Sequence, residues 1–319
     1  MENRKFVLVV HGGAGNIRNE VITADKQREA REGLEEALHA GHALLVAGGS
    51  SLDAVEATVK VLENNPMFNA GKGAAFNKAG GIELDAAIMD GKTLSAGAVA
   101  CVTTIKNPIS AARAVMERSP HVMLIGLGAD QFADEVGLEI VKPSYFWTPE
   151  RWEQLKKELK QESHSRTGRR QQSGSEPAPE KHGTVGCVAV DVRGNVAAGT
   201  STGGISSQHV GRVGDAPIIG AGTYASNDGC AVSATGHGEF FMRHVVAHEI
   251  SCLVKYKGLS VGQAAAHVVQ KTLKEAGGSG GVIAVDARGE FAMEFNSQGM
   301  YRGYILPDGQ PHAYIFREE

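Results

Sequence analysis

In His182-Gly183-Thr184-Val185-Gly186-Cys187-Val188-Ala189-Val190, the chain changes character abruptly. The preceding residues, 161–181, carry no aliphatic side chain longer than alanine, so they cannot bury apolar surface and are expected to form a flexible tail. From Val185 onward the side chains are small and apolar, a pattern that predicts a buried strand. Thr184 therefore stands where a flexible segment meets the start of a core strand.

Thr184 is a candidate nucleophile. A hydroxyl attacks poorly until a base takes its proton. A threonine that becomes a chain terminus carries its own base, the free α-amino group, with a pKa of about 7.7–8.0. Thr184 is therefore the residue that a functional interpretation must explain.

Composition limits the class of protein. The 319 residues are 42% hydrophobic, enough to bury a large core in one domain or two. No apolar run approaches the roughly 18 residues of a membrane helix, and the apolar run at 6–10 is too short for a signal peptide, so we expect no membrane partner and a cytoplasmic location. A net charge of −4 argues against a nucleic-acid partner. The four cysteines share no metal or redox spacing and are expected to be reduced and buried.

Hydrophobic periodicity predicts mixed elements in the first half of the chain. Ser50 and Asp53 have the spacing of a capping box and should open a helix that stops before Pro66. The other predicted elements are strands at 6–10, 82–89, 95–103 and 121–125, and helices ending at Gly48-Gly49, running from 107 to about 117, and running from 148 to 160.

The second half predicts two hairpins around two helices. One hairpin should turn at 191–195 and the other at 286–289, while helices are expected around 246–254 and from Ser260 to the glycines at 277–281. Strands followed by helices in both halves predict an α+β fold in which sheets are stacked between helical layers.

Two other kinds of site, a nucleotide-binding loop and a helical zinc site, fit the sequence poorly. The loop Gly71-Lys72-Gly73-Ala74 lacks the Gly-Lys-Ser/Thr order that binds phosphate and magnesium, which argues against a nucleotide site. His244 and His248 are four apart on a predicted helix, but Glu249 lies outside the pair, unlike the acid of a helical zinc-protease motif.

Three other segments carry suitable chemistry. Thr200-Ser201-Thr202-Gly203-Gly204 ends a predicted strand with three hydroxyls, which by itself is also compatible with an ordinary turn. In Gly211-Arg212-Val213-Gly214-Asp215, the arginine and aspartate are either a local ion pair or a pocket for an α-amino acid. Ala234-Thr235-Gly236-His237-Gly238 ends another strand where a helix begins, and free backbone N–H groups there could hold an oxyanion.

Together these segments resemble the plant-type L-asparaginases, or isoaspartyl peptidases, of the N-terminal-nucleophile hydrolases. The resemblance follows nearly the whole chain in order, through HGGAG (11–15), FNAGKGAAFN (68–77), ELDAAIMDG (83–91), AGAVA (96–100), NPISAARAVME (107–117), SPHVMLIG (119–126), HGTVGCVAVD (182–191), TSTGG (200–204), GRVGDAPIIGAG (211–222) and ATGHGE (234–239).

The resemblance implies a four-layer α-β-β-α sandwich formed by one domain, 1–319, that cuts itself between Gly183 and Thr184 into chains 1–183 and 184–319. Two such cleaved heterodimers would form an (αβ)2 assembly. By motif, Thr184 is the nucleophile and, through its new amine, the base. Thr202 would support the Thr184 hydroxyl.

The resemblance also implies the substrate-binding residues. The oxyanion would be stabilised by Asn69 and by the segment Thr235-Gly236. Arg212 would bind the substrate α-carboxylate, while Asp215 and the carbonyls of Gly236 and Gly238 would bind its α-amino group. The substrates implied are L-asparagine and β-aspartyl dipeptides, which release L-aspartate through an acyl-threonine.

No catalytic cofactor is implied, but a structural sodium ion is. It would be held by the main-chain carbonyls of Leu62, Glu63, Asn65, Phe68, Ala70 and Lys72. The alternatives are a glycosylasparaginase-like amidase, which typically has Thr-Ser-Thr-Asn-Gly where this chain has TSTGG, and an inactive homologue that only binds amino acids.

Overall fold

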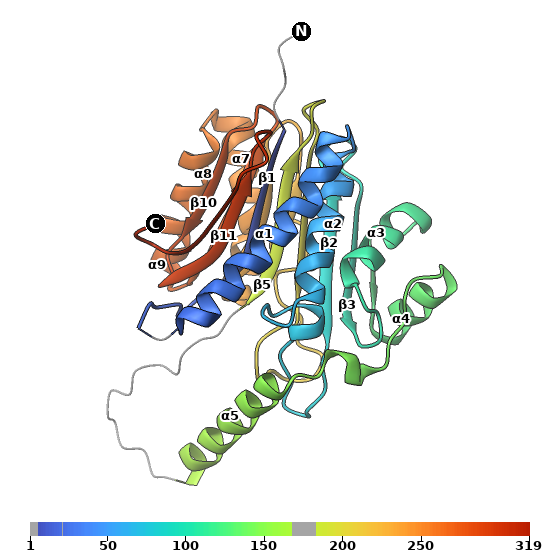
Figure 1. Ribbon diagram of the computed structural model, residues 1–319, viewed down its shortest axis with the longest axis vertical. Helices are drawn as coiled ribbons and strands as arrows, with labels where there is room; N and C mark the ends of the chain where they lie inside the picture. The colour runs from blue at the N-terminus through green and yellow to red at the C-terminus, as the bar shows by residue number, and fades with distance from the viewer. Residues whose placement is uncertain (1–5, 21, 168–182) are drawn as a thin grey trace.

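The computed structural model describes residues 6–20, 22–167 and 183–319, and it contains two sheets packed face to face (Figure 1). The larger sheet has the order β12-β11-β1-β5-β6-β2-β3-β4 and the smaller one β10-β9-β8-β7. The strands are β1 (Val7–Gly15), β2 (Leu84–Asp90), β3 (Ala96–Val102), β4 (Met123–Ile125), β5 (Thr184–Val190), β6 (Val196–Thr202), β7 (Thr223–Ala225), β8 (Cys230–Gly236), β9 (Gly280–Asp286), β10 (Phe291–Phe295), β11 (Gly299–Ile305) and β12 (Pro311–Phe316).

Helices cover the outer face of each sheet. α1, α2 and α3 pack on the larger sheet, and α7 and α8 pack on the smaller one, so the predicted four-layer α-β-β-α sandwich is confirmed (Figure 1). The helices are α1 (Ala24–Val46), α2 (Ser51–Asn64), α3 (Pro108–Arg118), α4 (Gly126–Glu135), α5 (Pro149–Thr167), α6 (Gly238–His244), α7 (Val246–Lys257), α8 (Val261–His267) and α9 (Lys274–Ala276), with short turns η1 (Gly71–Gly73), η2 (Pro143–Phe146) and a π-helical η3 (Val268–Leu273).

The alternation of side chains along β1 explains why it lies in the middle of the sandwich. Leu8 and Val10 belong to the core beneath the helices, whereas Val7 and Val9 belong to the core between the sheets. Successive side chains of a strand point to opposite faces, so a strand with two apolar faces fits between two cores. Each fully buried Val or Leu contributes about 1.5–3 kcal/mol.

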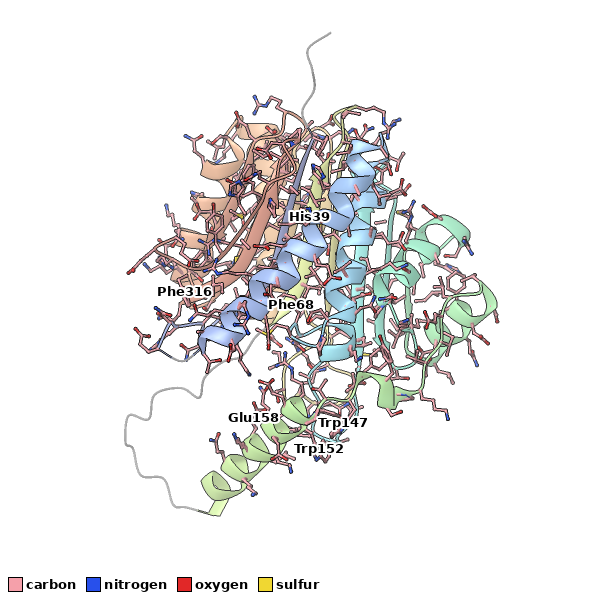
Figure 2. The ribbon with its side chains drawn as sticks, viewed as in Figure 1. His39, Phe68, Trp147, Trp152, Glu158 and Phe316 are labelled. Atoms are coloured by element: carbon pink, nitrogen blue, oxygen red, sulfur yellow. The ribbon has the colours of Figure 1, made fainter. Side chains whose placement is uncertain are left out.

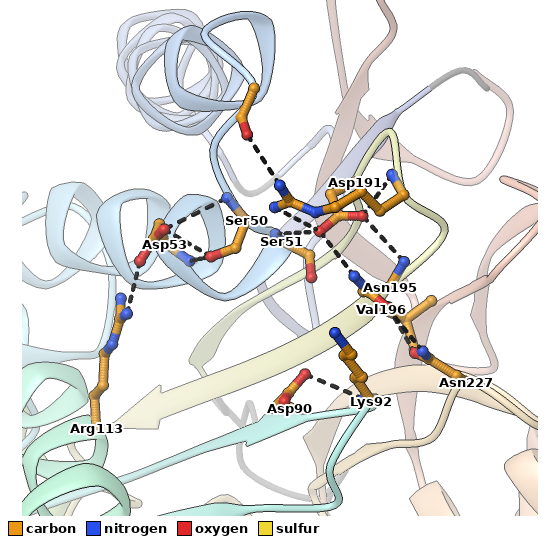
Figure 3. A network of polar contacts seen from close by, with 12 residues as sticks. Ser50, Ser51, Asp53, Asp90, Lys92, Arg113, Asp191, Asn195, Val196 and Asn227 are labelled. Atoms are coloured by element: carbon orange, nitrogen blue, oxygen red, sulfur yellow. Dashed lines mark hydrogen bonds and ion pairs between the residues drawn. The ribbon is translucent and has the colours of Figure 1, made fainter. Parts of the chain in front are cut away.

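The turn between β5 and β6 is tied to the start of α2 (Figure 3). The carboxylate of Asp191 accepts hydrogen bonds from the backbone N–H groups of Ser51 at 3.4 Å, Arg193 at 2.8 Å and Asn195 at 3.1 Å. The predicted capping box of α2 is also present, with Ser50 as its N-cap. These contacts fix the closed end of the hairpin, and its open end carries Thr184.

The predicted flexible tail is wrong in its first part, because α5 continues to Thr167. The composition of 161–181 argues against burial, but a helix can form without burying much apolar surface, and Gln, Glu and Arg are good helix formers. The rest of the predicted tail, 168–181, lies outside the described residues.

Two other predictions needed correction, one on the two histidines of a predicted helix and one on the burial of the cysteines. His244 ends α6, and Val245, with φ 48°, separates it from α7, so His244 and His248 lie on different helices. Cys187 and Cys230 are buried as predicted, whereas two other cysteines, Cys101 and Cys252, are partly exposed; all four thiols are unpaired. Among the helices described, none is both long enough and apolar enough to cross a membrane.

Candidate active site

The β5–β6 hairpin places Thr184 directly opposite Thr202. The Thr184 hydroxyl donates a hydrogen bond to the Thr202 Oγ1 atom at 3.1 Å. The Thr202 hydroxyl in turn donates to the Gly183 carbonyl oxygen at 3.3 Å and accepts from the Gly204 N–H at 3.0 Å. Thr202 therefore orients the candidate nucleophile and the carbonyl that precedes it.

Asn69 holds the same carbonyl from the loop after α2. Its Nδ2 atom donates to the Gly183 oxygen at 2.5 Å and to the Gly204 oxygen at 2.7 Å, while its Oδ1 atom accepts from the Ala75 N–H at 2.8 Å. The buried amide is thus fixed by three hydrogen bonds. Two donors, from Asn69 and Thr202, polarise the Gly183 carbonyl in the way that an oxyanion hole does.

The glycine-rich end of β1 presses against the Gly183–Thr184 junction. Gly13 has φ +110°, and a Cβ atom on it would lie 2.9 Å from the Gly183 Cα atom. The strand register shifts between His11 and Gly13, and such bulges often redirect backbone next to active sites. Only glycine therefore leaves room for this junction.

Thr235 and Gly236 end β8 beside the same stretch of β1. The fully buried Thr235 Oγ1 atom accepts the Ala14 N–H at 3.2 Å, which leaves its own proton free for another acceptor. Gly236 has φ +149°, and a Cβ atom there would lie 2.4 Å from the Ser279 carbonyl oxygen. The predicted oxyanion segment therefore lies close to the nucleophile strand.

Arg212, Asp215 and Gly238 lie close together. A Cβ atom on Gly238 would lie 2.8 Å from Asp215 Oδ1 and 3.1 Å from Arg212 Nη2. Arg212 forms its ion pair with Glu239 at 2.9 Å rather than with Asp215, so the local ion-pair interpretation is wrong. Asp215 is buried, and its Oδ2 atom has no hydrogen-bond partner in the part of the chain that the structure describes. Burial raises the pKa of Asp215 to about 7, although the Arg212 charge opposes this.

Asp85 is a site residue that the sequence reasoning missed. It lies on β2 directly opposite Thr202 and accepts the Cys101 N–H at 2.8 Å. Burial raises the pKa of Asp85 to about 6, while the Cys101 N–H and the Arg212 charge lower it. The available signal was an acid at the second position of β2 (LDAAIMD), whose other residues are apolar except for the last.

A second missed group is a buried chain of polar side chains between the two sheets. His11 Nε2 lies 2.9 Å from the Ser233 hydroxyl, which lies 2.7 Å from Thr200, and Thr223 donates to Thr200 at 2.7 Å. Burial lowers the pKa of His11 to about 3, so its ring is neutral at pH 7. These contacts join β1, β6, β7 and β8 behind the nucleophile.

A cavity of about 940 Å³ reaches the junction, and Gly183 and Asn69 form part of its lining. Arg212 and Asp215 are not among its lining residues. The junction therefore borders a cavity whose lining does not include Arg212 and Asp215.

The predicted sodium-binding carbonyls all lie at the end of α2 and in the loop after it. The last carbonyls of a helix have no partner within the helix, and oxygen atoms are the donors that hard cations prefer. Gly71, with φ +47°, folds the loop back so closely that a Cβ atom on it would lie 2.3 Å from the Glu63 carbonyl oxygen. Leu62 and Glu63 lie in the last turn of α2 and Asn65 is its C-cap, whereas Phe68, Ala70 and Lys72 lie in the following loop and the short turn η1.

Comparison with known proteins agrees with this geometry. Residues 4–315 match the model of a protein family described as asparaginase. The chain is 46% identical to an isoaspartyl peptidase of Salmonella typhimurium over 98% of its own length and 99% of that protein. It is 46% identical to an isoaspartyl peptidase of Escherichia coli (99% and 97%) and 42% identical to a probable isoaspartyl peptidase/L-asparaginase 2 of Arabidopsis thaliana (95% and 97%). The chain therefore belongs to the asparaginase family of enzymes.

Proposed function

We propose that this chain is a threonine-nucleophile amidohydrolase that releases L-aspartate from β-aspartyl dipeptides and L-asparagine after cutting itself before Thr184. The observation that carries the proposal is the junction itself, where the Thr184 hydroxyl is oriented by Thr202 and the Gly183 carbonyl is held by Asn69 and Thr202. The full-length similarity to proteins named isoaspartyl peptidase and L-asparaginase supports the same substrates.

Maturation begins when the Thr184 Oγ atom attacks the Gly183 carbonyl carbon. The C–O bond forms, the C–N bond breaks, and the Thr184 nitrogen takes the proton, which leaves an ester. Asn69 and Thr202 stabilise the oxyanion of this step. Water then hydrolyses the ester, so that chain 1–183 gains a carboxylate and chain 184–319 begins with a free amine.

In turnover, Arg212 binds the substrate α-carboxylate, and Asp215 with the carbonyls of Gly236 and Gly238 binds the ammonium group. The amine of Thr184 takes the hydroxyl proton as the oxygen attacks the side-chain carbonyl, and the same proton then leaves with ammonia or the departing amine. The oxyanion is held by Asn69 and by the Thr235-Gly236 segment. Water finally releases L-aspartate from the acyl-threonine, and no cofactor enters these steps.

The structure gives a reason to prefer this activity over that of a glycosylasparaginase-like amidase. A Cβ atom on Gly203 would lie 2.3 Å from the Ala74 Cβ atom. The asparagine that the alternative pattern has at this position would not fit without moving the loop that carries Asn69.

The proposal includes three further properties. A sodium ion held by the carbonyls at the end of α2 would stiffen the loop that carries Asn69. Two cleaved heterodimers would associate as (αβ)2. The protein would act in the cytoplasm.

Intact-mass spectrometry of purified protein tests the proposal together with an assay of L-aspartate release from β-aspartyl-leucine. We expect two chains, 1–183 and 184–319, that result from cleavage of the Gly183–Thr184 bond, and we expect activity in the cleaved form. Thr184→Ala should stay as one chain. The same two fragments from that variant under protease-free conditions would show that cleavage is not autocatalytic. Cleaved protein that binds L-aspartate but hydrolyses neither substrate would instead be an inactive homologue.

A further inference from the structure

The cavity beside Gly183 has no role in binding the aspartyl head, because Arg212 and Asp215 lie outside it. A substrate amide has two substituents on its carbonyl, the aspartyl head and the departing amine. With the head held by Arg212 and Asp215, the amine side must extend elsewhere from the reacting carbon. The cavity includes Gly183 and Asn69 in its wall and, at about 940 Å³, is large enough for a side chain and more.

One wall of the cavity is apolar. It includes Met67, Phe68, Trp147 and Tyr301. Figure 2 shows Phe68 beside the N-terminal half of α1 and Trp147 near the start of α5. A Cβ atom on Gly33 of α1 would lie 2.9 Å from the Phe68 ring, so the helix packs directly over this wall.

Helix α1 also contributes hydrogen-bond acceptors to the cavity lining. Glu29, Glu32 and Glu36 line the cavity at the i, i+3 and i+7 positions of α1, which share one face of a helix. Within the described ranges, Glu29 and Glu36 form no ion pair, and the buried Oδ1 atom of Asn16, which also lines the cavity, has no hydrogen-bond partner. Acceptors without partners favour a ligand that brings donors.

The cationic side chains that line the cavity each have a contact with another group of the protein. Lys26 pairs with Glu150, and the Lys72 Nζ atom lies over the Tyr145 ring, 5.4 Å from its centroid. Arg151 donates to the Gly73 carbonyl oxygen at 2.8 Å. The Glu29 and Glu36 carboxylates therefore remain available to a ligand that brings a cation.

We propose that this cavity is the subsite for the departing residue of β-aspartyl substrates, and that it selects lysine or arginine there. This inference rests on the proposed function. The methylene groups of a long cationic side chain would lie over Phe68 and Tyr301, and its charged end would reach the carboxylates of α1. An acidic departing residue would face like charges and should be disfavoured.

The test compares the kcat/KM values of the self-cleaved protein for β-aspartyl-lysine, β-aspartyl-norleucine and β-aspartyl-glutamate. Norleucine matches the lysine stem without its charge, and L-asparagine, whose departing group is ammonia, serves as the reference substrate. We expect lysine to be preferred to norleucine by roughly two- to tenfold, with glutamate the poorest, since exposed ion pairs are individually weak. The preference should shrink as salt concentration rises.

The double variant Glu29→Gln/Glu36→Gln should lose the lysine preference and keep its activity toward norleucine and L-asparagine. Glu35→Gln is the matched control, because Glu35 lies on the same helix but is not among the cavity-lining residues. Equal kcat/KM values for lysine, norleucine and glutamate in the active parent would overturn the subsite while leaving the proposed function intact. A parent that is active on no β-aspartyl substrate or L-asparagine would overturn both.

Discussion

At the scale of single residues, the candidate site contains a buried polar group that lacks one of its hydrogen-bond partners. Asp215 keeps one carboxylate oxygen without a partner in the part of the chain that the structure describes, although the residue is buried. Such an atom is costly unless something binds it, and a substrate ammonium group would satisfy it. The unpartnered oxygen of Asp215 therefore indicates where the ammonium group of a ligand would bind.

The affinity for L-aspartate should rise with pH. Burial raises the pKa of Asp215 to about 7, so the free carboxyl is protonated below that pH and ionised above it. Only the ionised form attracts the ammonium group, and linkage predicts a Kd about tenfold lower at pH 8 than at pH 6. Calorimetric titration measures this, and Asp215→Asn should remove the pH dependence. A Kd that stays constant across this range would contradict the assigned role.

Arg212→Ala should impair substrate binding and spare maturation, because the Gly183–Thr184 bond contains no free carboxylate. Losing the two charge-assisted hydrogen bonds of a guanidinium to a carboxylate costs about 1.5–3 kcal/mol of binding free energy, or roughly 10- to 100-fold in KM. Arg212→Lys should also be impaired, since an ammonium cannot make the two-pronged contact. Parent-like KM for a β-aspartyl dipeptide in Arg212→Ala would refute this role.

Asn69→Ala should slow self-cleavage. Its amide is one of two donors to the Gly183 oxygen, and removing an oxyanion donor typically reduces rates about 10²- to 10³-fold. The time course of conversion from one chain to two, followed by intact mass, measures the effect. Asn77→Ala is a control from the same loop, because Asn77 bonds to Glu83 and not to the junction. Cleavage at the parent rate in Asn69→Ala would exclude Asn69 from the maturation step.

At the scale of elements, α5 is anchored by its first half. Leu155 is buried, and the Trp152 ring makes an edge contact with Phe76 at 5.2 Å between centroids. Figure 1 shows the helix extending away from the sheets beyond this anchor. The end of α5 and the predicted tail should therefore contribute little to the core.

Deleting residues 163–176 should leave the melting temperature nearly unchanged, because the polar composition of this stretch gives it little to bury. Leu155→Ala is the contrasting variant, and it should cost about 2–5 kcal/mol, because it empties a buried site. Thermal unfolding of both variants and the parent measures these effects. A large drop in melting temperature after the deletion would show that the segment packs on the fold.

At the scale of the whole molecule, the sandwich buries several titratable groups. Burial raises the pKa values of Glu63 to about 7, Asp85 to about 6 and Asp215 to about 7. Burial also lowers the pKa of His11 to about 3. The layered core therefore couples folding to proton binding.

Stability should decrease as pH rises from about 5 to 7. In this range the folded protein retains protons on Glu63, Asp85 and Asp215 that the unfolded chain has released, so the stability they contribute at low pH is lost as pH passes the folded pKa values. The lowered pKa of His11 makes stability rise with pH, but this one group is outnumbered by the three carboxyl groups. Chemical unfolding at several pH values measures the trend. Stability that increases steadily from pH 5 to 7 would contradict it.

The sequence alone was enough to predict the elements that depend on local patterns. The Ser50 capping box, the β5–β6 hairpin and the helix from Ser260 follow from contacts within a few residues, and the structure contains them. The layered class followed from the order of strands and helices and from the resemblance in motifs. Local composition misjudged where α5 ends, because a lack of apolar side chains does not prevent a helix from forming.

Other features depend on contacts between distant segments, which local patterns do not encode. Asp85 lies opposite Thr202 because β2 pairs with β6. Arg212 forms its ion pair with Glu239, and not with Asp215, which is nearer in the sequence, because β8 leads into α6 at that point. The cavity beside Gly183 exists because α1, β1, the loop after α2 and the start of α5 meet there. The sequence indicated which chemical groups were available, but the pairing of strands and packing of layers determined which of them meet.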